Sequence, residues 1–210
     1  MSRRRQILDA AFQAFLAKGF AATSIEDIRA GSGASTGSIY HAFKGKAGIA
    51  AALVVEAMEA WAQATAQAAP RNPGGPDASI RAWVEGLIDW GLACPDQFQL
   101  MDGMRFLEQA PELARRLAQD RQAAELAYRD QVEAGEVRDL PWEVARALIL
   151  GPAYEFLRQR PTATRAARRA LSDAAWAAVR APRPTAKGAM AEPNPDQPSL
   201  PLDWPDVRRP

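Results

Sequence analysis

Apolar residues recur at spacings of three and four along almost the whole chain, and this periodicity predicts helices throughout. Runs that alternate between apolar and polar residues are absent, and alanine dominates the composition, so we expect an all-α protein without a sheet. The first predicted helix runs from about residue 2 to residue 18 and carries Ile7, Ala11 and Phe15 on one apolar stripe. Gly19 is placed to end it as a left-handed cap.

Two short helices are predicted next. Thr23 to Glu26 fits a capping box, in which the threonine hydroxyl and the glutamate carboxylate pair with free amides at a helix start. A Gly-Ser-Gly turn interrupts this helix, and Ser35 is a good N-cap for a second one over residues 36–43. Isolated helices shorter than about 12 residues are only marginally stable in water. The first helix and a long one over about residues 46–69 must therefore hold both in place.

A connector rich in proline and glycine, residues 70–76, is expected to mark a domain boundary. It separates a first domain, residues 1–50 with the long connecting helix to about residue 69, from a helical domain over residues 76–180. Helices in the second domain are predicted at residues 77–93, 96–108, 111–134, 141–159 and 163–180. Eight of the sixteen prolines fall in residues 181–210, which we expect to form a disordered tail.

The formal net charge of the 210 residues is only +1, so any nucleic-acid function must follow from the distribution of charge. Residues 1–50 hold seven basic and three acidic residues, a local charge of +4, which favours such a surface at this end. One cysteine, Cys94, and one histidine, His41, cannot supply a disulfide or the four ligands of a structural zinc site. No apolar run approaches the roughly 18 residues of a membrane span. We expect no cofactor, no metal, no membrane partner and a cytoplasmic location.

The first domain has the arrangement of a DNA-binding helix-turn-helix, with two short helices joined by a glycine-containing turn. The run from Thr23 to Lys46 closely resembles the signature of the TetR (tetracycline-repressor) family, with Gly-Ser-Ile-Tyr-His-x-Phe-x-x-Lys at its core. The resemblance covers about residues 3–53. Two positions depart from the family pattern: Thr36 stands where many relatives have Lys or Arg, and Ala47-Gly48 replaces the usual Glu-plus-polar start of the next helix.

The resemblance implies a transcriptional repressor that binds a palindromic double-stranded operator as a homodimer and is released by a small-molecule effector. Hydroxyl groups can contact phosphates or base edges, Tyr40 and His41 resemble the family's backbone-contacting pair, and Lys46 is expected to grip a phosphate. Gly37 costs about 1 kcal/mol of helix propensity, which makes sense if DNA approaches the backbone closely. The predicted DNA-binding residues are Thr23, Ser35, Thr36, Gly37, Ser38, Tyr40, His41, Lys44 and Lys46. Arg3 to Arg5 either follow a flanking minor groove or are simply solvated.

In the family, the second domain holds the inducer pocket and the dimer interface. Methionine and tryptophan adapt to flexible apolar ligands, so we predict a hydrophobic effector pocket, with a filled core as the alternative for each residue. Its residues are Trp83, Trp90, Phe98, Met101, Met104 and Tyr154. The last two helices are predicted to pair between protomers as a four-helix bundle. Their exposed residues are expected to be Ala145, Leu148, Ile149, Pro152, Ala153, Phe156, Ala167, Leu171, Ala174, Ala175 and Ala178.

The sequence leaves two other functions to consider. The sequence from Gly33 to Gly37 matches the G-x-S-x-G nucleophile elbow of hydrolases, with Ser35 as nucleophile. That elbow needs a preceding strand, whereas the preceding residues have a helical pattern, so we do not expect an enzyme. The other alternative is an all-helical ligand-binding or scaffolding protein that does not touch DNA. A DNA-binding protein should lose affinity steeply as salt rises, and Lys46→Ala should flatten that slope by about one unit.

Overall fold

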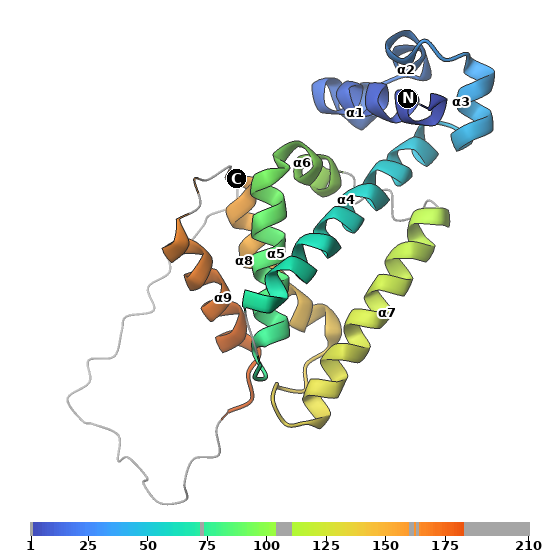
Figure 1. The fold of residues 1–210 in the computed structure, drawn as a ribbon. Coiled ribbons are helices and arrows are strands. Elements are labelled where there is room, and N and C mark those ends of the chain that lie inside the picture. The colour runs from blue at the N-terminus through green and yellow to red at the C-terminus, as the bar shows by residue number, and fades with distance from the viewer. Residues whose placement is uncertain (1, 72–73, 104–110, 160–161, 163, 183–210) are drawn as a thin grey trace, which may run out of the picture.

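The computed structural model describes residues 2–71, 74–103, 111–159, 162 and 164–182 (Figure 1). Within these ranges the secondary structure is helical, and one isolated antiparallel bridge joins Val137 to Arg180. The elements are α1 (Arg3–Ala22), α2 (Ile25–Ser32), α3 (Thr36–Phe43), α4 (Lys46–Ala68), the 3₁₀ turn η1 (Ala69–Arg71), α5 (Ala78–Ala93), α6 (Pro95–Gly103), α7 (Pro111–Glu133), α8 (Trp142–Arg158) and α9 (Arg165–Val179). The predicted all-α class is confirmed.

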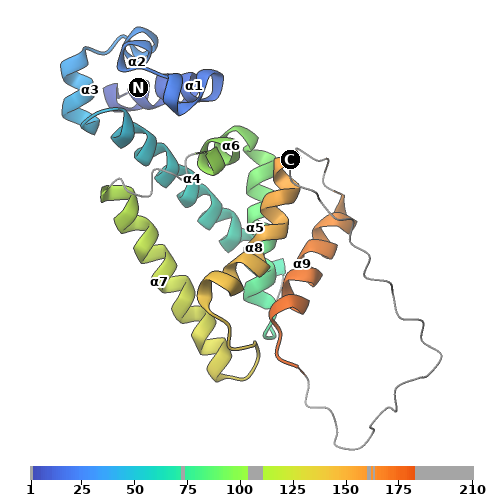
Figure 2. The same cartoon turned by 180° about the vertical axis from the view of Figure 1, so that it is seen from behind.

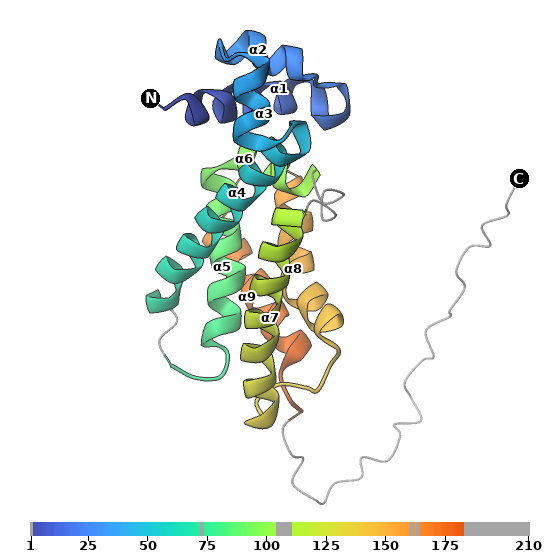
Figure 3. The ribbon, with the colours of Figure 1, turned by 90° about the vertical axis from the view of Figure 1, so that its right-hand side faces the viewer.

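Helices α1 to α3 and the first turns of α4 form one unit, which we call the head, above a bundle of longer helices, the body (Figures 1 and 3). The head contributes to one apolar core that is continuous with the core of the body, and α1 supplies the predicted stripe. The buried members in the head are Ile7, Leu8, Ala11, Phe15, Ile28, Ile39, Phe43 and Ile49. The short helices α2 and α3 are therefore stabilised by burial against α1 and α4.

Helix α1 begins within one residue of the predicted start but ends later than predicted. The Ser2 hydroxyl accepts a hydrogen bond from the backbone N–H of Arg5 at 3.2 Å and caps the helix. Arg3, Arg4 and Arg5 are thus its first turn and do not form an extended arm. Gly19 does adopt a positive φ of 76°, but its ψ of 164° lies outside the left-handed helical region, and a further short turn continues to Ala22.

The capping box at the start of α2 is shifted by one residue. Ser24 is the N-cap: its hydroxyl accepts from the backbone N–H of Asp27 at 3.1 Å, and the Asp27 carboxylate accepts from the Ser24 backbone N–H at 2.8 Å. Hydrogen bonds from Lys18 and from Ser24 hold the pKa of Asp27 well below its usual range. The Thr23 hydroxyl points inward, where it donates to the carbonyl oxygens of Gly19 and Ala14 at the end of α1.

Helix α4 belongs to both parts of the molecule. Its first turns pack against α1 and α3, while its later turns pack closely against α5 and α7. A Cβ at Gly86 of α5 would lie 2.5 Å from the Cα of Thr65 in α4, so only glycine permits this approach. The predicted connector at residues 70–76, of which 72–73 lie outside the described residues, falls between α4 and α5, and these two helices pack against each other.

Helix α6 is the second connection between the two parts. It contacts α1 as well as α4 and α5 (Figure 1). At its C-terminal end Asp102 forms a two-pronged ion pair with Arg158 of α8, with N to O distances of 2.9 and 3.0 Å, and this pairing raises the pKa of Arg158. A cavity of about 300 Å³ lies where α1, α4 and α6 meet, between Arg5, Glu56 and Gln97 among others.

Helices α8 and α9 lie side by side and both pack against α5 (Figure 2). Each helix must therefore turn one face inward. As a result the predicted exposure of Ala145, Ile149, Ala153 and Ala175 is wrong, because these four residues are buried in the chain's own core. Leu148, Pro152, Phe156, Ala167, Leu171, Ala174 and Ala178 remain partly or fully exposed. In the part of the chain that the structure describes, no helix combines the length and apolarity needed to cross a membrane.

Candidate nucleic-acid interface

Helix α3 is short and is held at both ends by local hydrogen bonds. The predicted N-cap Ser35 is confirmed, since its hydroxyl accepts from the backbone N–H of Ser38 at 3.1 Å. At the other end Lys44 takes the left-handed conformation, with φ of 58°, and its N–H donates to the Tyr40 carbonyl oxygen at 2.9 Å. Ile39 is fully buried beneath the helix and fixes which face points outward.

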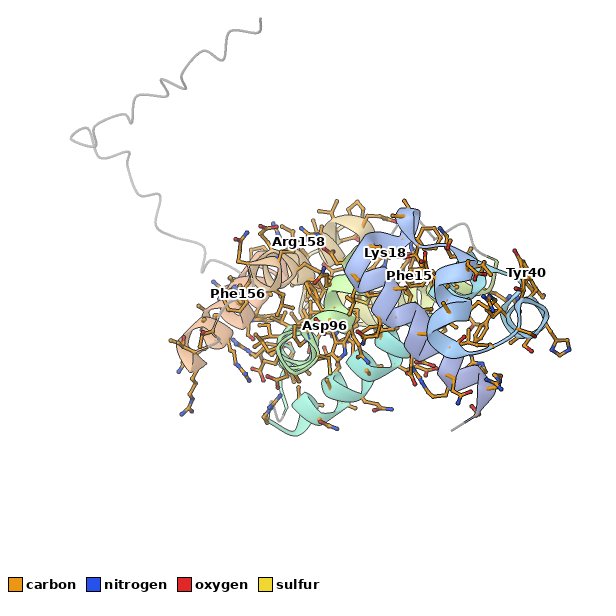
Figure 4. The ribbon with its side chains drawn as sticks, turned by 90° about the horizontal axis from the view of Figure 1, so that it is seen from above. Phe15, Lys18, Tyr40, Asp96, Phe156 and Arg158 are labelled. Atoms are coloured by element: carbon orange, nitrogen blue, oxygen red, sulfur yellow. The ribbon has the colours of Figure 1, made fainter. Side chains whose placement is uncertain are left out.

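The outward face of α3, which we call the reading face, consists of Ser35, Thr36, Gly37, Ser38, Tyr40, His41 and Lys44. All of these are exposed except Ser38, which is half-buried. Tyr40 is 52% exposed, and Figure 4 shows it projecting from the outer edge of the head. The structure thus brings seven of the nine predicted DNA-binding residues onto one accessible helix face.

Gly37 lies on this face, where nothing inside the protein requires a glycine. Its φ is not positive, and a Cβ added there would meet nothing nearer than the Ser35 hydroxyl oxygen at 4.0 Å. Alanine would fit and would favour the helix by about 1 kcal/mol. No contact among the described residues therefore requires glycine at position 37.

Gly48, by contrast, is explained within the chain. A Cβ at this position would lie 1.8 Å from the carbonyl oxygen of Phe43, so the first turn of α4 can pass the end of α3 only with glycine there. This packing accounts for Gly48 in the Ala47-Gly48 pair that departs from the family pattern.

The remaining two predicted residues have structural roles. The Lys46 ammonium donates to the carbonyl oxygens of Phe20 at 2.7 Å, Ala21 at 3.3 Å and Thr23 at 2.6 Å, and it lies 4.5 Å from the centre of the Phe20 ring. It neutralises the unpaired carbonyl end of α1. The Thr23 side chain is 1% exposed. Neither side chain is exposed toward a duplex in this conformation, so we do not include Lys46 or Thr23 among the proposed DNA contacts.

The aromatic residues of the body form two separate groups. In the first, Trp61, Tyr154, Phe98 and Trp90 follow one another with ring centroids 6.4, 5.7 and 6.1 Å apart. In the second, Trp142 lies 6.0 Å from both Trp83 and Tyr128. The predicted pocket set is therefore divided: Trp90, Phe98 and Tyr154 are together, Trp83 belongs to the other group, Met101 is buried in the core, and Met104 lies outside the described residues.

Trp61 of α4 is not among the predicted pocket residues, because the sequence pattern marks its helix only as the connection between the two domains. Its indole N–H is buried and has no hydrogen-bond partner among the described residues. The neighbouring Trp90 indole, in contrast, donates to the side-chain oxygen of Gln97 at 3.2 Å. An unpaired buried donor costs roughly 1–3 kcal/mol, which makes the surroundings of Trp61 a candidate place for a ligand with an acceptor atom.

The hydrolase alternative finds no support in the local geometry. The segment before Ser35 is helix α2 and not a strand, and the Ser35 hydroxyl is engaged with Ser38, whose hydroxyl oxygen lies 2.9 Å away. Over the ranges described above, no group of three His, Cys, Asp or Glu side chains is placed to hold a metal ion.

Comparison with known proteins agrees with this geometry. Residues 7–53 match the family model described as bacterial regulatory proteins of the tetR family. The HTH-type transcriptional repressor Rv1474c of Mycobacterium tuberculosis is 30% identical over 159 residues, which cover 70% of this chain and 76% of that repressor. Similar solved folds include a putative tetR family regulator from Shewanella sp. PV-4, with TM-score 0.69, 22% identity and coverage of 87% of this chain and 100% of that one. Another is a tetR family regulatory protein from Rhodococcus RHA1, with TM-score 0.66, 20% identity and coverage of 85% and 97%. This chain belongs to the TetR family of transcriptional regulators.

Proposed function

We propose that this protein is a ligand-responsive repressor that binds a palindromic operator as a homodimer and is released by a small hydrophobic effector. The observation that carries the DNA-binding part is the reading face of α3, with a glycine at its centre that the protein's own packing does not require. The family membership supports the same function.

The chemistry of the reading face favours backbone and methyl contacts. Thr36, Ser38 and Tyr40 supply hydroxyl groups, and the threonine methyl can also pack against a thymine methyl. The α3 helix contains no Arg, Asn or Gln, the side chains that make two-pronged contacts to guanine or adenine. Phosphate contacts should therefore supply most of the affinity, with a steep dependence on salt.

Dimerisation through the outward faces of α8 and α9 would place two reading faces on successive major grooves, about 34 Å apart. Val144 and Leu148 on α8 and Ala170 and Ala174 on α9 leave an apolar surface at helical spacing. A Cβ at Gly151 of α8 would meet nothing within 4 Å, so a partner helix could approach closely there. Sedimentation as a dimer at micromolar concentration is the expected result, and a monomer would contradict it.

The effector is proposed to bind beside Trp61, within the first aromatic group. A flat apolar molecule with one carbonyl oxygen would pack against the aromatic rings, and that oxygen would accept a hydrogen bond from the unpaired indole N–H of Trp61. Trp61 lies on α4, which continues into the head. An effector that binds better to a conformation with α4 displaced must lower the affinity for the operator, and the coupling free energy between the two sites is typically 1–3 kcal/mol.

Selection of duplexes from a random pool by the full-length protein tests DNA binding. The expected product is an inverted repeat whose affinity falls steeply with salt, and no enrichment at low salt would refute the function. Tyr40→Ala should weaken binding of the selected duplex, whereas Leu126→Ala, which removes a similarly exposed side chain on α7, should not. Apolar ketones and carboxylic acids can then be screened for release of the duplex, with Trp61→Phe expected to reduce the response.

A further inference from the structure

A cleft of about 450 Å³ runs between the first turn of α1 and one side of α3. Its lining residues are Arg3, Arg4, Ile7, Gly37, Ser38, His41 and Ala42. None of these is acidic, and the two arginines face small residues of α3. The cleft is therefore open, positively charged and bordered by part of the reading face.

The guanidinium of Arg3 is held in one orientation, but only one of its three nitrogens donates hydrogen bonds within the described residues. Its Nη1 donates to the side-chain oxygen of Gln6 at 3.1 Å and weakly to the carbonyl oxygen of Gly33 at 3.4 Å, which holds it beside the turn between α2 and α3. The N–H groups on Nε and Nη2 have no partner in the described part of the chain. An arginine that is already positioned loses less conformational freedom when it binds an anion.

The second arginine and the α3 wall complete the cleft. The Arg4 guanidinium lies over the Phe43 ring, 5.1 Å from its centre, and its Nη1 is 3.9 Å from Oε1 of Glu56. On the α3 wall, the Ser38 hydroxyl lies 2.9 Å from the Ser35 hydroxyl and can donate into the cleft when Ser35 is the donor of that pair. Neither ring nitrogen of His41 bonds to any residue that the structure describes. Two arginines, a hydroxyl and an imidazole around one open space match the ligands of a phosphate.

We infer that this cleft binds one phosphodiester of the operator backbone, with Arg3 as its principal ligand. The inference rests on the proposed function and moves the main phosphate contact from Lys46, which caps α1, to the first turn of α1. From α3 the cleft is lined by Gly37, Ser38, His41 and Ala42, whereas Tyr40 and Lys44 are not among its lining residues.

The test is the salt dependence of binding to the duplex selected by the wild-type protein. Arg3→Ala should flatten the slope of log affinity against log salt by about one unit and weaken every duplex by a similar factor. Arg129→Ala is the control, because it removes another exposed arginine, from α7 of the body, and should leave the slope unchanged.

Two outcomes would overturn the inference. An unchanged slope for Arg3→Ala, with the circular dichroism of the wild type, would mean that Arg3 meets no phosphate. A loss confined to certain sequences would mean that Arg3 contacts a base edge. Arg3→Lys should retain the slope, which separates loss of charge from loss of the α1 first turn. Failure of the wild-type protein to bind any duplex would instead refute the proposed function.

Discussion

Replacement of Lys46 separates a structural role from a DNA-binding one. Lys46→Met keeps the apolar stem and removes the ammonium that donates to Phe20, Ala21 and Thr23. Hydrogen bonds from a charged donor contribute about 1.5–3 kcal/mol net. The freed carbonyls at the end of α1 can recruit water, so we take about 2–3 kcal/mol for the whole group, including the contact with the Phe20 ring. For a chain of this length, that loss corresponds to a fall in Tm of roughly 4–12 °C.

Lys44→Met is the matched control. It removes a charge of the same sign from Lys44, an exposed side chain two positions before Lys46. A surface change of this kind should alter the free energy of unfolding by less than about 0.5 kcal/mol. It should flatten the salt slope of duplex binding, because Lys44 lies on the reading face. Lys46→Met should leave that slope unchanged.

The measurements are urea unfolding followed by circular dichroism and duplex binding at several salt concentrations. The two variants should show opposite patterns, one losing stability and the other losing salt dependence. Unaltered stability of Lys46→Met together with a slope flattened by about one unit would refute the reasoning, because Lys46 would then be a phosphate ligand and not a cap.

Three further changes test other parts of the head. Thr23→Val keeps the shape of the buried side chain but leaves the Gly19 carbonyl oxygen without its donor, so urea unfolding should show a loss of about 1–3 kcal/mol. Lys18 lowers the pKa of Asp27, so the stabilising effect of the Asp27 carboxylate is complete above the ordinary carboxyl pKa of about 4 and is lost as the pH falls. Asp27→Asn should therefore lower the free energy of unfolding at pH 7 and flatten the decline of that free energy below about pH 4. Gly37→Ala should raise the free energy of unfolding by about 0.5–1 kcal/mol and still weaken duplex binding, and unchanged binding would contradict a close approach of DNA.

The helices of the body could be predicted closely because their limits are encoded locally. Proline and glycine break the apolar periodicity at each boundary, and the observed α5, Ala78–Ala93, differs by one residue from the predicted helix over 77–93. The reading face could be predicted for the same reason, since Ser35 caps a short helix whose buried residues are evident from their spacing.

The partners of Lys46 and Thr23 could not be predicted, because they are backbone carbonyls of another helix. Lys46 lies next to them only after α4 folds back across the end of α1. The capping box was ambiguous within the sequence itself: Thr23 and Ser24 are both hydroxyl residues followed three positions later by an acidic one. Tertiary packing decides between them, because the Thr23 hydroxyl reaches the carbonyl oxygen of Gly19 and Ser24 is left to cap α2.

Gly37 and Gly48 are two glycines of the same N-terminal region, and packing within the protein explains only one of them. Both lie in helices without a positive φ, so the sequence gives no ground for treating them differently. Gly48 is fixed by a carbonyl oxygen of its own chain, and replacing it must disturb the junction of α3 and α4. Gly37 faces open space beside Arg3, Ser38 and His41. A glycine that weakens its helix and relieves no contact among the described residues fits the close approach of DNA proposed above, and the basic side chains beside Gly37 suit a polyanion.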